Sequence, residues 1–324
     1  MDTSTLNANI PEDCDGKRFD QALAEMFPDY SRSRLQGWIR GGRALLDGAE
    51  VQPRARVATG QAVEVRPELE QVVDDASEAM TLDVVFEDEH VIVINKPAGL
   101  VVHPGAGNPA GTLLNGLLHR APELSVLPRA GILHRLDKDT SGLLLVTRSV
   151  AAQTQLTRDL EQRLIRREYR AVCQDRLTAG GTVDAPIGRH RVHRTRMAVT
   201  NAGRPAVSHY RVLHRFDAHS FIAVRLETGR THQIRVHMAH VHHPLIGDPV
   251  YGGRLRLPKG AGESVHAALQ AFRRQALHAS DLGFVHPVSG EEMRFHAPLP
   301  DDMLCLLNAL ADNQNVDFEA MQWP

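Results

Sequence analysis

The segment GILHRLDKDTSGLLLVT, residues 131–147, places ionisable side chains directly before a continuous apolar run. Leu143 to Val146 are consecutive apolar residues, the pattern of a strand that is buried on both faces. Thr140 to Gly142 supply the residues of a turn that leads into this strand. Asp137 is therefore expected at the rim of a hydrophobic core, where a carboxylate can be reactive. Physical reasoning alone leaves open a second interpretation, in which Asp137 is a solvated or capping residue near a turn.

The composition is that of a globular protein large enough for more than one core. The chain has 324 residues, of which 42% are hydrophobic and 23% are charged, so we expect two domains or one large domain with an appendage. Cys14, Cys173 and Cys305 lack close spacing, which argues against a disulfide framework and fits a reducing cytosol. No signal-peptide pattern is present, and no apolar run approaches the roughly 20 residues of a membrane span. We expect a cytoplasmic protein without a membrane partner.

Charges are segregated along the chain, although the formal net charge is only −2. Residues 67–80 carry several acids and no base, whereas residues 189–215 contain no acid and are rich in arginine and histidine. A basic segment without acids favours a polyanionic partner, and a solvated loop is the alternative. Its arginines are candidate phosphate contacts, which position a nucleic acid without reading its sequence. They include Arg189, Arg191, Arg194 and Arg196.

Residues 16–66 have the pattern of a small α/β module. The sequence predicts a helix over residues 18–27, a second helix capped by Ser31 and ended by Gly41-Gly42, and strands near 44–46 and 62–65. The second helix has one apolar face, and arginines lie on a neighbouring flank that is suited to phosphates. Solvated arginines on an ordinary helix are the alternative. The candidate phosphate contacts are Arg32, Arg34, Arg40 and Arg43.

An acidic linker is expected over residues 67–80, with a larger domain from residue 81 to residue 311. A helix is predicted from about Val150 to Ile165, and its apolar residues share one stripe. Strands are predicted at 84–86, 91–95, 143–146, 169–173, 207–214 and 220–226. Helices and strands without regular βαβ alternation predict an α+β fold with a mixed, largely antiparallel sheet.

His134-Arg-Leu-Asp137 followed by Thr140-Ser-Gly-Leu143 resembles the active-site motif of the RluA-type pseudouridine synthases. Arg167-Glu-Tyr169 and the segment from Arg225 to His237 resemble two further elements of this family. The module at 16–66 resembles an S4 RNA-binding domain, through its Arg18-Phe-Asp-Gln-Ala-Leu-Ala and Ser31-Arg-Ser-Arg-Leu stretches. The resemblance extends from about residue 16 to residue 310. Residues 312–324 lie outside it and are expected to form a mobile tail.

The resemblance implies roles for individual residues. Asp137 would act at the ribose of a uridine, either by adding to C1′ or by assisting formation of a glycal. Arg235 would pair with this carboxylate, an interaction of roughly 4 kcal/mol at 4 Å and an effective dielectric near 20, before desolvation is subtracted. Tyr169 would lie over the target base, and Arg135 would fill the place that the flipped uridine leaves. Arg230, in the same motif as Arg235, is expected to contact RNA.

Each of these residues also has a structural interpretation. Without the motif, Arg235 would be read as a strand residue in a surface ion pair, Tyr169 as a packed core residue and Arg135 as a member of a structural salt bridge. The histidines at 232, 237, 240, 242 and 243 suggest a metal site, but their spacing is irregular and no acidic or cysteine ligand completes a recognisable set. No motif for a bound nucleotide cofactor is present. We therefore expect neither a metal nor a cofactor.

For the substrate, the resemblance implies isomerisation of uridine to pseudouridine in 23S ribosomal RNA. The expected target is the interface stem-loop helix 69, modified by a monomeric enzyme within an assembling large ribosomal subunit. A pseudouridine synthase for another rRNA or tRNA site is one alternative, because target choice lies in peripheral contacts. A non-catalytic ribosome-assembly factor that only binds RNA is the other.

Overall fold

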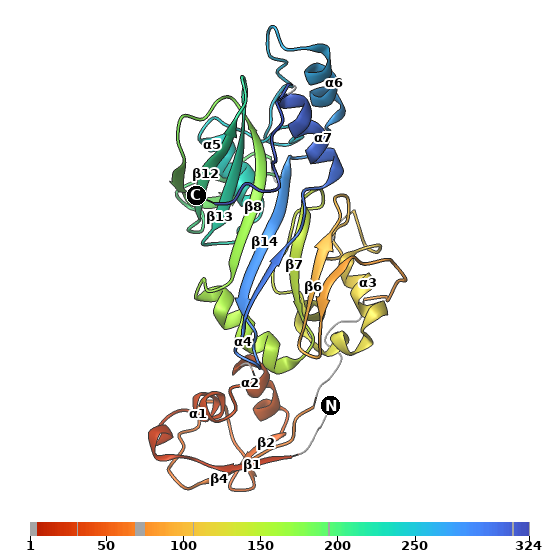
Figure 1. The fold of residues 1–324 in the computed structure, drawn as a ribbon. Helices are drawn as coiled ribbons and strands as arrows, with labels where there is room; N and C mark the ends of the chain where they lie inside the picture. Colours follow the sequence, from red (N-terminus) through yellow and green to blue (C-terminus); the bar gives the residue numbers. More distant parts are fainter. Residues whose placement is uncertain are drawn as a thin grey trace.

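The structure is a computed structural model, and it describes residues 5–30, 32–68, 75–105, 107–193, 195–312 and 314–323. Three predicted features lie outside the described residues: the Ser31 helix cap, the phosphate contact of Arg194, and residues 69–74 of the acidic linker. Figure 1 shows a small N-terminal module at one end of the molecule and a larger part built around long strands. We call residues 5–68 the N-terminal module and the part from residue 75 onward the sheet domain.

The N-terminal module contains two helices packed on a small antiparallel sheet. Helices α1 (Phe19–Met26) and α2 (Arg32–Arg40) and the short 3-10 helix η1 (Glu12–Cys14) precede most of the strands. The strands are β1 (Leu6–Asn9), β2 (Ala44–Leu46), β3 (Ala49–Glu50) and β4 (Ala62–Val65), in the order β1-β4-β2-β3. The predicted helices and strands are thus present. Strand β1 lies before Gly16, the predicted start of the module. The sequence did not predict this strand, because its four residues include no β-branched residue.

The sheet domain is built on one nine-stranded sheet. Its strands are β5 (Val84–Glu87), β6 (Val91–Lys96), β7 (Ser141–Thr147), β8 (Arg166–Gln174), β9 (Gly181–Asp184), β12 (Val207–Arg215), β13 (His219–Leu226), β14 (Leu277–Val285) and β15 (Glu292–His296). The order is β5-β6-β7-β14-β8-β13-β12-β9, with β15 paired to β14. Every described pairing in this sheet is antiparallel except that of β7 with β14. The α+β fold with a mixed, largely antiparallel sheet is confirmed.

Helices cover both faces of this sheet. They are α3 (Leu113–Arg120), α4 (Val150–Glu161), α5 (Gln233–His240), α6 (Glu263–Ala271) and α7 (Asp301–Leu310), with 3-10 helices η2 (Pro122–Val126) and η3 (Pro128–Gly131). All residues of β7 are buried: Leu144 and Val146 join the core that contains α3 and α5, and Leu143 and Leu145 join the core that contains α4. The prediction of a strand buried on both faces is therefore confirmed. A separate pair of strands, β10 (Ile187–Arg189) and β11 (Met197–Val199), forms a hairpin.

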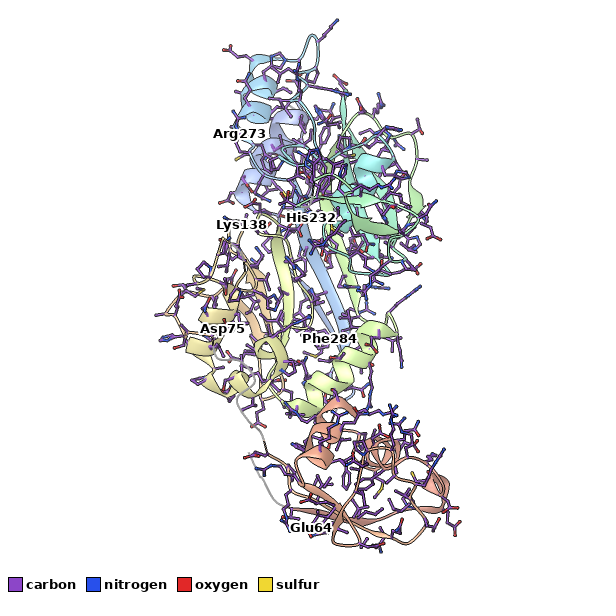
Figure 2. The ribbon with its side chains drawn as sticks, turned by 180° about the vertical axis from the view of Figure 1, so that it is seen from behind. Glu64, Asp75, Lys138, His232, Arg273 and Phe284 are labelled. Atoms are coloured by element: carbon purple, nitrogen blue, oxygen red, sulfur yellow. The ribbon has the colours of Figure 1, made fainter. Side chains whose placement is uncertain are left out.

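Hydrogen bonds between described residues join the N-terminal module to the sheet domain. Arg34 Nη2 donates to the Val126 carbonyl at 2.8 Å, and Thr154 Oγ1 donates to the Asp29 carbonyl at 3.0 Å. Arg158 Nη2 donates to the Pro28 carbonyl at 3.3 Å. The module thus contacts η2 and α4. Figure 2 shows Glu64 of the module and Arg273 of the sheet domain at opposite ends of the molecule, with Lys138 and His232 between them.

The C-terminal residues, expected as a mobile tail over 312–324, pack against the sheet in the structure. Phe318 is 3% exposed, and its ring contacts the rings of Phe216 and Phe221. Arg170 Nη2 donates to the Met321 carbonyl at 3.0 Å, and the guanidinium carbon of Arg225 lies 4.0 Å from the ring centroid of Trp323. Phe318 and Trp323 thus attach the segment to the sheet, and Val316 and Met321 pack against the same core cluster as Phe318. No helix in the described ranges is long and apolar enough to cross a bilayer.

Candidate active site

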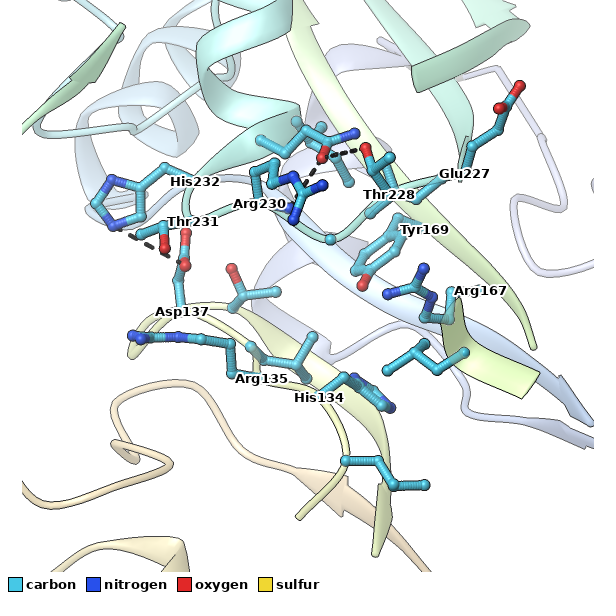
Figure 3. Close-up of a pocket in the computed structure, with 18 of the residues that line it drawn as sticks. His134, Arg135, Asp137, Arg167, Tyr169, Glu227, Thr228, Arg230, Thr231 and His232 are labelled. Carbon is cyan, nitrogen blue, oxygen red and sulfur yellow. Dashed lines mark hydrogen bonds and ion pairs between the residues drawn. The ribbon is translucent and has the colours of Figure 1, made fainter. Parts of the chain in front are cut away.

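A pocket with a volume of about 750 Å³ opens between the segment before β7 and the segment between β13 and α5. Figure 3 shows Asp137 and Arg135 on one wall, Arg230 and His232 on the facing wall, and Tyr169 beside Arg167 on the floor strand β8. The predicted residues Asp137, Tyr169, Arg235, Arg135 and Arg230 all line this pocket. The fold therefore brings together residues that are far apart in the sequence.

Asp137 lies in the turn before β7 and is paired with Arg235. Its carboxylate oxygen Oδ2 accepts a hydrogen bond from Arg235 Nη1 at 2.9 Å, and the side chain of Asp137 is 15% exposed. The Asp137 carbonyl accepts from the backbone N–H of Thr140, which closes the turn. Arg235 lies in helix α5. Its interpretation without the motif, as a strand residue in a surface ion pair, is wrong. Alternating Ile234 and Val236 resemble a strand pattern, but both are buried in a helix that packs on β11 and β12.

Asp248, which the sequence analysis did not single out, holds the other side of the Arg235 guanidinium. Arg235 Nε and Nη2 donate to Asp248 Oδ2 and Oδ1 at 2.7 and 2.9 Å. Burial would raise the pKa of Asp248, but the hydrogen bonds and charge of Arg235 outweigh burial and hold that pKa below its usual range. Burial likewise opposes the charge of Arg235, yet the two carboxylates raise its pKa. Asp248 and Arg235 therefore form an ion pair that is charged at neutral pH, and this pair holds the guanidinium against Asp137.

Lys96 is a second residue that the sequence analysis did not assign to the site. Its side chain is completely buried, and Nζ donates to the carbonyls of Pro97, Leu100 and Lys138 at 2.8, 2.9 and 3.0 Å. The three contacts attach the backbone beside Asp137 to the turn after β6. Burial lowers the pKa of Lys96 to about 8, against the opposing charges of Asp139 and Asp137. Lys96 therefore supports the loop that presents Asp137.

Tyr169 belongs both to the core and to the pocket. It is 5% exposed and packs in the main core cluster, while its ring also lines the pocket beside Arg167 (Figure 3). Burial raises the pKa of Tyr169, so its phenol stays protonated at neutral pH. The core interpretation and the base-contact interpretation are thus compatible for this residue. The residue supplies a rigid aromatic surface at the pocket wall.

Three residues that line the pocket each have one buried nitrogen without a hydrogen-bond partner in the described part of the chain: His103 Nε2, His134 Nδ1 and Arg167 Nε. Burial lowers the pKa of His134 to about 3, and its Nε2 accepts from the Leu145 backbone N–H at 3.2 Å. His134 is therefore neutral with its proton on Nδ1. Leaving buried donors unpaired costs about 1–3 kcal/mol each. Such donors favour a bound molecule that offers acceptor oxygen atoms.

The predicted RNA-contacting arginines fall into two groups. Arg135 is exposed at the pocket, and Arg230 is half-buried, with Nε donating to the Pro205 carbonyl at 3.1 Å. Four others are exposed at the ends of secondary-structure elements or in the β10–β11 loop: Arg40, Arg189, Arg191 and Arg196.

Three arginines of the N-terminal module instead make intramolecular contacts. Arg32 is paired with the buried Asp20 at 2.8 Å, and Arg43 is paired with Glu68. Arg34 donates to the Val126 carbonyl across the boundary between the module and the sheet domain. The guanidinium of Arg34 is thus used in holding the two parts together, which the helical pattern did not predict.

The histidines that suggested a metal site make separate contacts. His237 bonds to Ser208 Oγ and to the Ala185 carbonyl, both at 2.9 Å, and His243 Nδ1 bonds to the Gln174 carbonyl at 3.1 Å. Among the described residues, the one group with ligand atoms close enough for a metal is Asp13, Cys14 and Glu25 in the N-terminal module. The cluster is remote from the pocket in the fold and is not part of the site.

Comparison with known proteins assigns the chain to a family. Residues 90–240 match the family model described as RNA pseudouridylate synthase. A protein of Xanthomonas campestris pv. campestris named "Ribosomal large subunit pseudouridine synthase D" is 54% identical over 313 residues, which cover 97% of this chain and 95% of the relative. The chain belongs to the RluA-type RNA pseudouridine synthases. It is therefore an RNA pseudouridine synthase, an isomerase that acts on RNA.

Other relatives and solved structures support the same assignment. Proteins with the same name from Escherichia coli (strain K12) and Yersinia pestis are 54% and 52% identical, over 97% and 98% of this chain and 95% and 98% of their own. The structure "Human RNA Pseudouridylate Synthase Domain Containing 4" is 25% identical, with a TM-score of 0.55 over 70% of this chain and 92% of its own. A second, "Human RNA Pseudouridylate Synthase Domain Containing 1", has a TM-score of 0.52 at 25% identity, over 73% of this chain and 97% of its own.

Proposed function

We propose that this pseudouridine synthase modifies specific uridines of 23S ribosomal RNA, in the interface stem-loop helix 69, within an assembling large subunit. The observation that carries the reaction is the hydrogen bond from Arg235 to the Asp137 carboxylate in a pocket of about 750 Å³. The substrate assignment is supported by relatives named for the large ribosomal subunit that are similar over nearly their whole length. The enzyme is proposed to act as a monomer.

The chemistry is an isomerisation that needs no net oxidant or reductant. The bond between N1 of uracil and C1′ of ribose breaks, the base rotates, and a bond forms between C5 and C1′. The C5 proton leaves and N1 gains a proton, so the atoms of uridine and pseudouridine balance. Asp137 acts at the ribose, either by adding to C1′ or by removing a proton from C2′ to give a glycal. Both routes use the carboxylate of Asp137, which Arg235 holds in place through its hydrogen bond to Oδ2.

Tyr169 and Arg135 act on the base and on the surrounding stack. In the proposed complex, the ring of Tyr169 lies against the target uracil, a contact of about 1–3 kcal/mol per base in single-strand binders. The exposed Arg135 lines the pocket two residues before Asp137. A planar cation at this place fills the gap that the extruded uridine leaves and offsets the few kcal/mol that flipping costs.

RNA binding extends beyond the pocket. The exposed arginines of the β10–β11 hairpin and Arg40 of α2 contact phosphates, together with an S4-like unit over residues 16–66. Within this proposal the catalytic domain comprises residues 81–311. Arg34 is assigned to the contact between the two parts, in keeping with its hydrogen bond to Val126.

The test is to incubate the purified protein with 23S rRNA or with precursor large subunits, without added metal or nucleotide. Pseudouridines are then mapped by chemical modification and primer extension. Product in the interface stem-loop supports the proposal, and product elsewhere overturns the target while leaving the enzyme class. No product on either substrate favours an RNA-binding assembly factor. Asp137→Asn should fold and bind RNA but form no product; substantial product from this variant would remove Asp137 from its role.

A further inference from the structure

His232 lies on the other side of Asp137 from Arg235 and has no part in the mechanism described above. Its Nε2 is 3.9 Å from Asp137 Oδ1, whereas Arg235 contacts Oδ2 at 2.9 Å. Figure 3 shows the imidazole facing the carboxylate across the opening of the pocket. The separation is too long for a direct hydrogen bond. Oδ1 of Asp137 therefore faces an N–H or a lone pair of His232 across a gap.

The partner of Nδ1, the other ring nitrogen of His232, decides whether Nε2 presents an N–H or a lone pair to Asp137. His232 Nδ1 is 2.8 Å from the Tyr251 hydroxyl oxygen, which also accepts from the Met197 backbone N–H at 2.9 Å. If Nδ1 carried the proton, the Nε2 lone pair would face the carboxylate oxygen and repel it. The Tyr251 hydroxyl therefore donates to Nδ1, and Nε2–H points toward Asp137. Burial lowers the pKa of His232, so the ring carries one proton at neutral pH.

The backbone around His232 is constrained in a way that holds this ring in place. His232 has φ 58° and ψ 23°, a left-handed conformation that costs a non-glycine residue about 1–2 kcal/mol. The side chain of the next residue, Gln233, locks the turn: Oε1 accepts from the Arg230 N–H at 2.9 Å, and Nε2 donates to the Val207 carbonyl at 3.0 Å. Strain of this kind persists where the surrounding structure over-determines it.

A hydroxyl group fits the gap between His232 and Asp137. An oxygen placed at a hydrogen-bond distance of about 2.8 Å from both atoms would accept from Nε2–H and donate to Oδ1. Only a group that is donor and acceptor at once satisfies both partners, and the ribose 2′-hydroxyl is such a group. We propose that His232 and Asp137 together bind the 2′-hydroxyl of the target uridine, so that the active site itself distinguishes RNA from DNA. The inference rests on the proposed action of Asp137 at the ribose.

The test compares two synthetic stem-loop RNAs that differ only at the mapped target, which is uridine in one and 2′-deoxyuridine in the other. Pseudouridine formation is followed by chromatography of the digested nucleosides, and kcat/KM is measured for each RNA. The wild-type enzyme should prefer the ribouridine substrate by about 10- to 100-fold, the range for a hydrogen bond to a charged group. A ratio near one for the wild type overturns the inference.

Two matched variants identify the donor. His232→Gln keeps an N–H at a similar reach, and His232→Met is similar in size but has none; both place a non-glycine residue in the same left-handed conformation. The ribouridine preference should persist in His232→Gln and fall toward one in His232→Met. Equal ratios in the two variants contradict the assignment. Tyr251→Phe, which frees the His232 tautomer, should reduce the ratio several-fold and serves as the second variant if His232→Met does not fold.

The outcomes separate this inference from the proposed function. If the wild type makes no pseudouridine in the ribouridine RNA, the proposed target is wrong, and the comparison is repeated at the uridine that the mapping does identify. If the wild type modifies the RNA but His232→Met keeps the full preference for ribouridine, the target stands and His232 has no role in binding the 2′-hydroxyl.

Discussion

Arg235 gives one guanidinium nitrogen to Asp137 and two to Asp248. The contact to Asp137 is a single hydrogen bond from Nη1 to Oδ2 at 2.9 Å, whereas Asp248, whose side chain is completely buried, accepts from Nε and Nη2 at 2.7 and 2.9 Å. Asp248 is therefore the anchor of the cation. Because Asp137 shares only one oxygen with Arg235, its second oxygen is available to a ribose in the pocket. Arg235 thus fixes the orientation of the Asp137 carboxylate through Oδ2 and leaves Oδ1 free to react.

Removing the charge of the anchor should lower the rate more than RNA affinity. Asp248→Asn keeps the shape of the side chain but removes the charge that holds Arg235, so Arg235 will turn toward Asp137 and engage both of its oxygens. We expect kcat to fall about 10- to 100-fold, equivalent to roughly 1.4–2.7 kcal/mol of transition-state stabilisation, with little change in the Kd for RNA. Single-turnover kinetics and filter binding measure the two quantities.

The control for this variant is Asp139→Asn, an acid in the loop of Asp137 that makes no described contact with Arg235. It should leave kcat within about twofold of the wild type. If Asp139→Asn and Asp248→Asn lower kcat equally, the effect is one of net charge and not of the Arg235 contact.

Lys96 predicts a specific pH dependence of stability. Its pKa is about 8 in the folded protein and 10.5 as an unperturbed group. Between these pH values the unfolded chain keeps the proton and the folded chain has lost it, so this residue makes the folded state relatively more stable as pH rises. The free energy of unfolding of the wild type minus that of Lys96→Met should increase by about 1–3 kcal/mol from pH 8 to pH 10.5. Urea titrations at matched pH values measure the difference.

A fall in this difference over the same pH range would contradict the prediction. It would mean that the three carbonyls that accept from Nζ hold the proton more firmly than burial expels it. At pH 7, Lys96→Met removes the contact of Nζ with the Lys138 carbonyl and should loosen the loop before β7. This result would show the structural role of Lys96.

The sequence predicts the site residues whose neighbours along the chain form a recognisable pattern. The apolar run after Asp137 predicted its place at the rim of the core, and this run lies in the fully buried strand β7. The choice of Asp137 as the candidate carboxylate came from the motif around it. Without the motif, Arg235 is read as a strand residue in a surface ion pair. The structure places it in helix α5, which packs on β11 and β12. Asp248 carries no local signal, since its role depends on where the guanidinium of Arg235 lies.

Surfaces that depend on two distant segments were also not predictable. The flank of α2 that carries Arg34 reads as an RNA-binding face, yet Arg34 meets the Val126 carbonyl because the N-terminal module packs against η2. Phe318 lies in a polar segment that reads as mobile. Its burial depends on the apolar surface that Phe216 and Phe221 form on the sheet, which lies far from residues 312–324 in the sequence.

The packing of the C-terminal segment predicts that it contributes to stability and not to chemistry. Phe318→Ala removes a side chain that is 3% exposed and should lower the free energy of unfolding by about 3–5 kcal/mol. Activity below the melting transition should stay within about twofold of the wild type. Trp323→Ala, at a partly exposed ring over Arg225, is the milder control. A Phe318→Ala protein with unchanged Tm would mean that the segment is not attached to the sheet in solution.

The basic segment from Arg189 to Arg215 should divide into RNA contacts and structural contacts. Arg191 and Arg196 are exposed in the β10–β11 loop, whereas Arg215 donates from Nε and Nη2 to the carbonyls of Leu177 and Thr178 at 2.8 and 2.7 Å. Replacing either loop arginine by alanine should lower the slope of log K against log salt by about 0.7–0.9 per phosphate contact. Arg215→Ala should leave the slope unchanged and reduce stability, because it leaves two carbonyls without their donor.

Binding titrations of these variants at several salt concentrations measure the slopes, and thermal unfolding measures the stability. The loop is joined to the site by the hydrogen bond from the Met197 N–H to the Tyr251 hydroxyl, which orients His232. A phosphate held by Arg191 or Arg196 therefore positions RNA at the same end of the pocket as Asp137. If Arg191→Ala and Arg196→Ala leave the salt slope unchanged while Arg215→Ala lowers it, the RNA follows a different face of the sheet domain.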